Sequence, residues 1–148
     1  MINQYTKLKK ITLFELLRKI EKEKNDLLLI NKMTLPSRKN QNEILENLIL
    51  GIPFTIKGAA NKKGEILISS LELNTLLFFF NGNINFKSHF FTEGLPLDIN
   101  QIGDELKSMI ESIEINIYYL CPSVDLDWTL SYIGEECTKE QLESFNNV

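Results

Sequence analysis

The 148-residue sequence predicts one compact α+β domain, spanning residues 1–148, in which several helices pack on a small mixed sheet. Three observations support this fold class. Some segments repeat apolar residues at helical spacing, others alternate apolar with polar residues or form short apolar runs, and turn residues separate the segments. With 43% hydrophobic and 24% charged residues, the chain can form one core but is short for two.

The first predicted helix begins at a capping box, Thr12-Leu13-Phe14-Glu15. In this motif the threonine hydroxyl accepts a hydrogen bond from the third helical amide, and the glutamate reaches back to the threonine amide. We expect the helix to end near Lys24 and to turn one apolar stripe towards the core. The stripe comprises Leu13, Phe14, Leu16, Leu17 and Ile20.

The amino-terminal stretch is basic, but Glu15, Glu21 and Glu23 interleave with its cations. This mixture is typical of a solvated helix face, and a basic contact surface is the alternative. The cations concerned are Lys7, Lys9, Lys10, Arg18, Lys19, Lys22 and Lys24.

The next segments predict a strand, a helix and a strand pair. The short apolar run at 27–30 favours a buried strand, and a helix follows from Gln41 until Gly51 and Pro53 stop it. Two strands, at 54–56 and 65–68, then flank a loop from Gly58 to Gly64.

The second half of the chain predicts a buried helix, further strands and three more helices. Ser69 or Ser70 caps a helix that is apolar on nearly every face, and Asn81-Gly82 ends it. The remaining elements are a strand pair formed by Ile84 and Phe86 with Phe90 and Phe91, a helical pattern from Ile99 to Ile113, an alternating strand at 113–119, a helix through Leu126, Leu130 and Ile133, and a last helix opened by Thr138-Lys139-Glu140-Gln141.

Composition argues against several classes of function. With 16 basic and 20 acidic residues, the net charge of −4 gives no general attraction to nucleic acid. No apolar run approaches the roughly 20 residues of a membrane span, and the first residues do not open a secretory signal, so we expect a cytoplasmic protein. Cys121 and Cys137 are too few for a disulfide framework or a metal site, which favours buried free thiols.

The order of these features resembles the ParB/sulfiredoxin-like family, in the branch found in GmrSD-type modification-dependent restriction systems. That family approaches a helix through "Pro…Gln-Arg" and leaves it through "Gly-Ile-Pro". Here Leu35-Pro36-Ser37-Arg38 precedes the helix and Gly51-Ile52-Pro53 follows it. The resemblance spans nearly the whole chain and implies a ParB/sulfiredoxin-like fold.

The family's signature is missing at one place. Where the family has Asp-Gly-Gln-Gln-Arg between a strand and a helix, this chain has Ser69-Ser70-Leu71-Glu72-Leu73. Phosphate binding needs cations or backbone amides, and Leu73 supplies neither charge nor hydrogen bond, while Glu72 adds negative charge. We therefore expect the nucleotide chemistry of the family to be lost, so that the chain is not an enzyme and takes no cofactor.

Other polar groups favour a structural interpretation. His89 is the only histidine, and Asp125 and Asp127 do not face each other on a helix, so neither indicates a catalytic or metal site. A set of aromatic residues could instead form a contact patch for a protein partner, or complete the core. These residues are Tyr118, Tyr119, Trp128 and Tyr132.

The sequence thus predicts a non-catalytic protein-binding or structural module that docks onto other protein subunits in an oligomeric assembly. A bacteriophage virion component, such as a subunit of a tail or neck ring, is its most concrete form. Two alternatives remain. One is an inhibitor or regulator of a restriction or defence system, and the other is a divergent nucleotide-binding protein in which Arg38, Ser69, Ser70 and Glu72 line a relic pocket.

Overall fold

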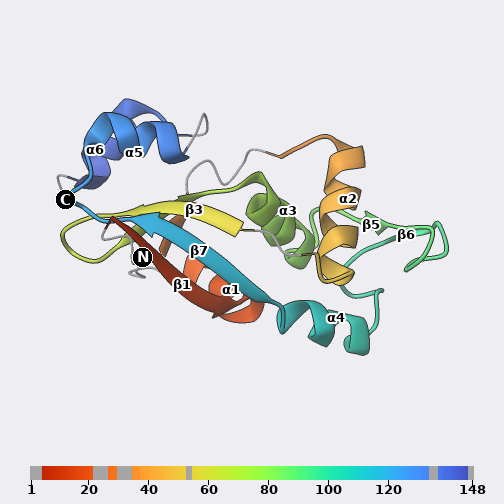
Figure 1. The fold of residues 1–148 in the computed structure, drawn as a ribbon. Coiled ribbons are helices and arrows are strands. Elements are labelled where there is room, and N and C mark those ends of the chain that lie inside the picture. The colour runs from red at the N-terminus through yellow and green to blue at the C-terminus, as the bar shows by residue number, and fades with distance from the viewer. Residues whose placement is uncertain (1–4, 22–26, 30–34, 53–54, 134–136, 147–148) are drawn as a thin grey trace.

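A computed structural model of the chain describes residues 5–21, 27–29, 35–52, 55–133 and 137–146. It is an α+β fold built on a mixed sheet, which confirms the predicted class (Figure 1). The strands of the main sheet are β1 (Thr6–Thr12), β2 (Leu27–Leu29), β3 (Thr55–Ala60), β4 (Ile66–Ser69) and β7 (Glu114–Leu120), and a small separate pair comprises β5 (Phe86–Lys87) and β6 (Pro96–Leu97).

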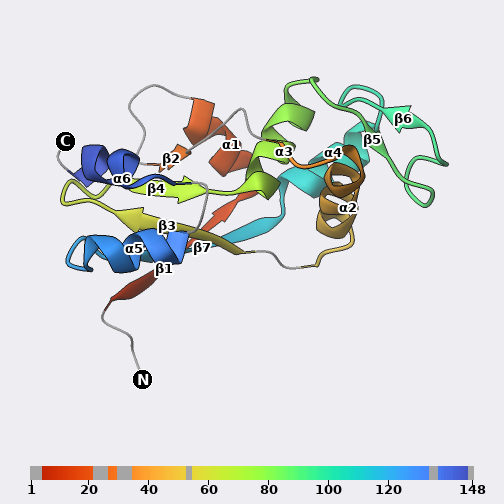
Figure 2. The same cartoon turned by 90° about the horizontal axis from the view of Figure 1, so that it is seen from above.

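The helices lie in three groups around the sheet. Figures 1 and 2 show α5 and α6 over one face, α1 on the other side, and α2, α3 and α4 gathered at one end together with the β5–β6 pair. Their bounds are α1 (Leu13–Glu21), α2 (Arg38–Ile49), α3 (Leu71–Phe80), α4 (Asp104–Glu111), α5 (Leu126–Ile133) and α6 (Lys139–Asn146).

The main sheet has the order β1-β7-β3-β4-β2. Strand β7 pairs antiparallel with β1 and parallel with β3, and β4 pairs antiparallel with β3 and parallel with β2. Strands from the two ends of the chain therefore meet at β7. Among the described residues, β1 forms one edge of the sheet.

Successive side chains of a strand point to opposite faces, so the sheet separates two cores. On the first face, Ile56, Ile115 and Ile117 pack with apolar residues of α1, α2, α3 and α4. On the second face, Ala59 and Leu67 pack with residues of α5 and α6. The second core is smaller, and its helices leave part of β1 and β7 uncovered.

Helix α3 is buried between other elements, as its apolar sequence predicts. Leu73, Leu76 and Phe79 are fully buried, and the rings of Phe79 and Phe86 meet edge to face, 6.3 Å apart. The helix thereby links the sheet to the β5–β6 pair.

Several helix ends follow the predicted capping. The Thr12 hydroxyl accepts a hydrogen bond from the amide of Glu15, and Ser70 does the same for Leu73. Thr138 and Gln141 complete a reciprocal capping box at α6. After α2, Gly51 (φ 79°) carries the chain out of the helix, because glycine adopts a positive φ without steric penalty.

The turn between β3 and β4 is held by one buried asparagine, Asn61, which is 3% exposed. Its Oδ1 accepts hydrogen bonds from the amides of Lys63 and Glu65. Its Nδ2 donates to the Glu65 carboxylate at 2.9 Å and to the carbonyl of Phe145 in α6 at 3.2 Å. One side chain therefore closes the turn and ties α6 to the sheet.

The predicted loop from Gly58 to Gly64 was too long. Gly58 lies inside β3, where an added Cβ would stand 2.9 Å from the carbonyl oxygen of Leu67 and 3.0 Å from Ile68 Cγ2. Here the glycine marks a close approach of two strands and not a flexible loop.

Three further expectations were wrong. Lys7, Lys9 and Lys10 lie on strand β1 and not on a helix, because the residues pair along β7. Phe90 and Phe91 lie in the turn between β5 and β6 and form no strand. Phe14 is exposed beneath the Arg18 guanidinium, whose carbon lies 5.5 Å from the ring centroid, and does not join the core.

The boundaries of other predicted elements also differ. Helix α2 begins at Arg38, because Ser37 caps it, and not at Gln41. The helical pattern from Ile99 to Ile113 contains a helix only over Asp104–Glu111. The predicted end of α1 near Lys24 and the helix stop at Pro53 lie outside the described residues.

Gly58→Ala should destabilise the fold by about 1–3 kcal/mol, since the methyl group meets backbone that has little room to move. The direction of the change in the free energy of unfolding is informative, because a glycine-to-alanine substitution without a clash generally stabilises a protein. Urea denaturation measures the effect. Thr55→Ala, at an exposed site on the same strand, should change the free energy of unfolding by about 0.5 kcal/mol or less. A Gly58→Ala protein as stable as the parent would contradict the close approach of β3 and β4.

Asn61→Ala should cost about 2–4 kcal/mol, because it leaves backbone donors and the Phe145 carbonyl without their partner. Asn146→Ala, at the exposed end of α6, is the matched control and should stay within about 0.5 kcal/mol of the parent. Thermal or urea unfolding of both variants makes the comparison, and equal losses would refute the role of Asn61.

Candidate functional site

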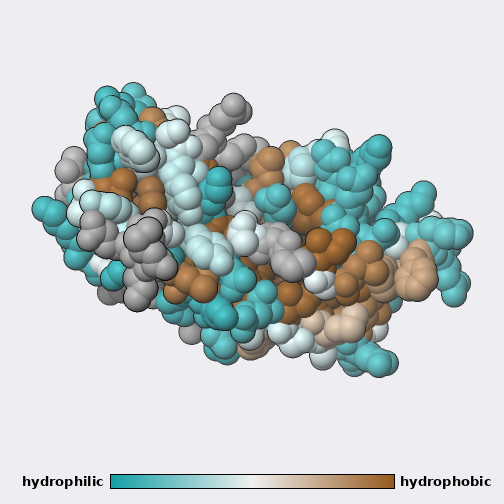
Figure 3. Space-filling view, viewed as in Figure 1, coloured by the Kyte–Doolittle hydropathy of each residue, from teal (hydrophilic) through white to brown (hydrophobic). Residues whose placement is uncertain are grey.

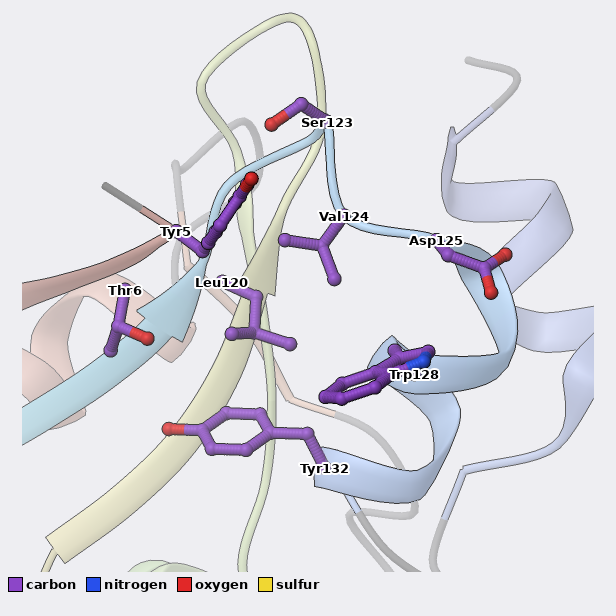
Figure 4. A pocket seen from close by; sticks show the side chains of 8 residues that line it. All are labelled: Tyr5, Thr6, Leu120, Ser123, Val124, Asp125, Trp128 and Tyr132. Carbon is purple, nitrogen blue, oxygen red and sulfur yellow. The ribbon is translucent and has the colours of Figure 1, made fainter. Parts of the chain in front are cut away.

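A cavity lies on the second face of the sheet, between α5 and the strands β1 and β7. It has a volume of about 530 Å³. Figure 4 shows the rings of Tyr5, Tyr132 and Trp128 on three sides of this space, with Leu120 and Val124 between them, and the Asp125 carboxylate pointing away. We call it the aromatic groove, and its lining residues are Tyr5, Thr6, Leu120, Ser123, Val124, Asp125, Trp128 and Tyr132.

Local structure places the groove residues from both ends of the chain. Thr6 lies opposite Leu120 in the β1–β7 ladder, and the Tyr5 carbonyl accepts a hydrogen bond from Cys121. The turn after β7 closes through a bond from Val124 to the Cys121 carbonyl. Two segments more than a hundred residues apart in the sequence thus form one wall of the groove.

Tyr132 is the fixed ring of the groove. Its hydroxyl donates to the backbone carbonyl of Tyr118 at 2.9 Å, and the Lys57 ammonium lies 5.3 Å from its ring centroid. Burial, with a smaller contribution from Tyr118, raises the pKa of Tyr132 above its ordinary value of 10.0. The ring is therefore held in place as a neutral phenol.

Trp128 is the exposed ring of the groove, with 76% of its surface accessible. It lies in the first turn of α5, which Thr129 secures by donating its hydroxyl to the Asp125 carbonyl at 3.0 Å. An indole held on a short, anchored helix presents a large apolar surface to solvent.

The structure divides the predicted aromatic patch. Trp128 and Tyr132 line the groove, and Tyr118 is exposed on the same face of β7. Tyr119 points to the opposite face and packs against the first core. The sequence interpretation missed Tyr5 and Leu120, because it did not predict β1. The only local signal was the β-branched content of Thr6, Ile11 and Thr12.

The proposed relic pocket is distributed over two places. Arg38 lines a second cavity with Asn42, Asn85, Lys87 and Pro96. Ser70 caps α3 and donates its hydroxyl to the Glu72 carboxylate at 3.1 Å, while Ser69 belongs to β4, its side chain lying outside the description. Among the described side chains, neither Ser70 nor Glu72 lines the second cavity. A nucleotide site formed by all four residues stays a prediction.

The side chains of His89, Cys121 and Cys137 are not among the described residues that line the groove. His89 is exposed, neither Cys121 nor Cys137 forms a disulfide, and burial raises the pKa of the Cys137 thiol. The described part of the chain contains no group of three or more His, Cys, Asp or Glu side chains placed to hold a metal ion. Within the same residues, no helix has both the length and the apolar character needed to cross a bilayer.

Exposed apolar side chains also gather away from the groove. Figure 3 shows apolar surface beside the end of α2 and towards α4. Leu50, Ile52 and Met109 are exposed there. Neither of the two cavities described above is lined by these three residues.

Comparison with protein-family models, curated proteins and solved structures gave no match to this chain. The resemblance to the ParB/sulfiredoxin-like family therefore stays a prediction from the sequence, and the function has to be argued from the geometry of the chain itself.

Tyr132→Phe should lower the free energy of unfolding by about 0.5–1.5 kcal/mol near neutral pH, because the bond to the Tyr118 carbonyl is lost. The folded-state pKa of Tyr132 lies above the unfolded value of 10.0, so its contribution is complete below pH 10.0 and is lost as the pH rises through the folded pKa. Urea denaturation from neutral to strongly alkaline pH should show the free energies of unfolding of Tyr132→Phe and the parent protein converge. A constant difference at every pH would contradict this.

Proposed function

We propose that this chain is a non-catalytic protein-binding module whose docking surface is the aromatic groove. The exposure of Trp128 beside an apolar cavity is the observation that carries the proposal. Tryptophan and tyrosine dominate binding energies at protein interfaces, and a concave apolar surface accepts a partner's side chain.

The groove is preorganised for binding. The Tyr132 hydroxyl is bonded to strand β7 and the first turn of α5 is anchored by Thr129, so the walls lose little freedom when a partner is bound. Catalysis has no comparable support there, because Asp125, the one carboxylate among the described lining residues, points away from the three rings.

The apolar surface continues from the groove onto the sheet. Leu8 lies opposite Tyr118 in the β1–β7 ladder, and both side chains are exposed on the same face as the groove. A partner segment that fills the cavity with one large apolar side chain can therefore extend across β1 and β7. Such a segment gains contact area from the cavity and from the exposed face of the two strands.

The charge on the groove's face of the sheet favours an acidic partner. Lys10 and the exposed Lys57 lie on that face, opposite Asn116 and Tyr118 of β7, whereas Lys7 and Lys9 point to the other face. The ion pair between Lys10 and Glu114, 3.9 Å long and exposed, contributes little. Lysines on an edge strand oppose pairing with a second copy of the same edge and attract carboxylates. We infer that the occupant is an acidic segment of a different subunit that carries one bulky apolar residue.

This proposal is compatible with a subunit of an assembly joined through unlike surfaces, such as the bacteriophage tail or neck ring expected from the sequence. In such a ring each subunit presents a groove to one neighbour and a segment to another.

Selection of a displayed library of random peptides on the immobilised full chain tests the groove. We expect selected peptides to share acidic residues around one large apolar residue. Trp128→Ala should weaken their binding by about 30-fold or more, the effect of a hot-spot residue. Phe90→Ala removes an aromatic ring that is 80% exposed in the β5–β6 turn and should leave the affinity unchanged.

Two results would contradict the proposal. One is a consensus of basic peptides, since it would reverse the charge argument from Lys10 and Lys57. The other is a loss of affinity in Phe90→Ala with none in Trp128→Ala, since it would place binding outside the groove.

A further inference from the structure

A second cavity lies between the start of α2 and the small β5–β6 pair, at the opposite end of the molecule from the aromatic groove. Both views of the fold place α2 beside these strands (Figures 1 and 2), and α2 is in contact with β5. The volume is about 380 Å³, within the range of roughly 300–1,000 Å³ typical of small-molecule pockets. Its lining residues are Arg38, Asn42, Asn85, Lys87 and Pro96.

The lining of this cavity is cationic although the chain as a whole has a net charge of −4. Arg38 and Lys87 come from elements far apart in the sequence, and none of the described lining residues carries a carboxylate. Within the part of the chain that the structure describes, neither cation forms an ion pair at 4.0 Å or less. Two positive charges without a counter-charge make the space suited to an anion.

The neighbouring polar groups are also set as donors. Asn42 Oδ1 accepts a hydrogen bond from the Lys87 amide at 3.0 Å, which leaves the Nδ2 group of Asn42 to donate elsewhere. Arg38 is the first residue of α2, a helix of 12 residues, so the positive end of the helix dipole lies at the same place.

The walls of the cavity are joined by a second contact. One turn beyond Asn42, the Glu46 carboxylate accepts a hydrogen bond from the Ser88 hydroxyl at 2.6 Å. Strand β5 is therefore fastened to α2 by bonds from Lys87 and Ser88, and the distance between the two cationic walls is fixed by the fold. The backbone of the two walls is thus preorganised, and binding an anion has to order only the exposed Arg38 and Lys87 side chains.

We propose that this cavity binds the phosphate group of a small molecule. A phosphate presents several oxygen atoms around one centre, which suits a guanidinium, an ammonium and amide donors that come from different walls. Its described lining residues include none from the lining of the aromatic groove and none of Ser70–Leu73.

Isothermal titration calorimetry of the full chain tests the site, with inorganic phosphate, glycerol 2-phosphate and acetate as probes and sodium chloride holding the ionic strength constant. We expect saturable binding of at least one phosphate probe and none of acetate. Whichever of inorganic phosphate and glycerol 2-phosphate binds more tightly tells whether the ligand carries a free or an esterified phosphate group. Lys87→Ala and Arg38→Ala should each weaken binding by about tenfold or more, the order expected for loss of a charge-assisted hydrogen bond.

Asn42→Asp separates binding from folding. It keeps the acceptor for the Lys87 amide, so the fold should persist, but it replaces the donor with a negative charge and should abolish phosphate binding. Lys63→Ala, which removes an exposed lysine from the β3–β4 turn, should bind as the parent does. No saturable phosphate binding, equal binding of acetate, or unchanged affinity in both Lys87→Ala and Asn42→Asp would overturn the proposal.

Discussion

The pairing of β7 with both β1 and β3 is the interaction on which the rest of the structure depends. Residues near the two ends of the chain enter the sheet through it, and the alternation of its side chains assigns residues to the two faces. Ile115, Ile117 and Tyr119 enter the first core, whereas Tyr118 and Leu120 face the groove. A shift of β7 by one residue would exchange these faces and remove both the core and the groove.

The two faces of the sheet are covered unequally, and this inequality creates the aromatic groove. Helices α1–α4 supply the first core, while the buried contacts of α5 and α6 with the second face are to Ala59 of β3 and Leu67 of β4. Asn61 and Phe145 hold α6 in that position, and α5 follows from the turn after β7. The exposed strip of β1 and β7 is thus a result of how the terminal helices are anchored.

The two proposed sites differ in chemistry because they are built from different kinds of element. The groove lies between a sheet face and a helix, so its lining is mainly apolar and aromatic. The second cavity lies between a helix start and two short strands, whose exposed positions carry cations and amides. One chain can therefore offer a protein-binding surface at one end and an anion site at the other.

Many helix boundaries were determined by the sequence itself, because caps and stops are interactions between neighbouring residues. The hydroxyls of Thr12, Ser70 and Thr138 and the positive φ of Gly51 act within one helical turn, so the pattern alone predicts them. The buried character of α3 also followed from its composition. These features yield the α+β class before any tertiary contact is known.

Strand pairing and both sites were decided only by the tertiary structure. Thr6–Thr12 has a weak strand pattern and becomes β1 because β7, more than a hundred residues later, pairs with it. Tyr5 and Trp128 line one groove, and Arg38 and Lys87 line one cavity, only when the elements that carry them pack together. Gly58 appears as a loop residue until the close approach of β4 explains it. Local hydrogen bonds leave a signature in neighbouring residues, whereas contacts between distant segments leave none in a single sequence.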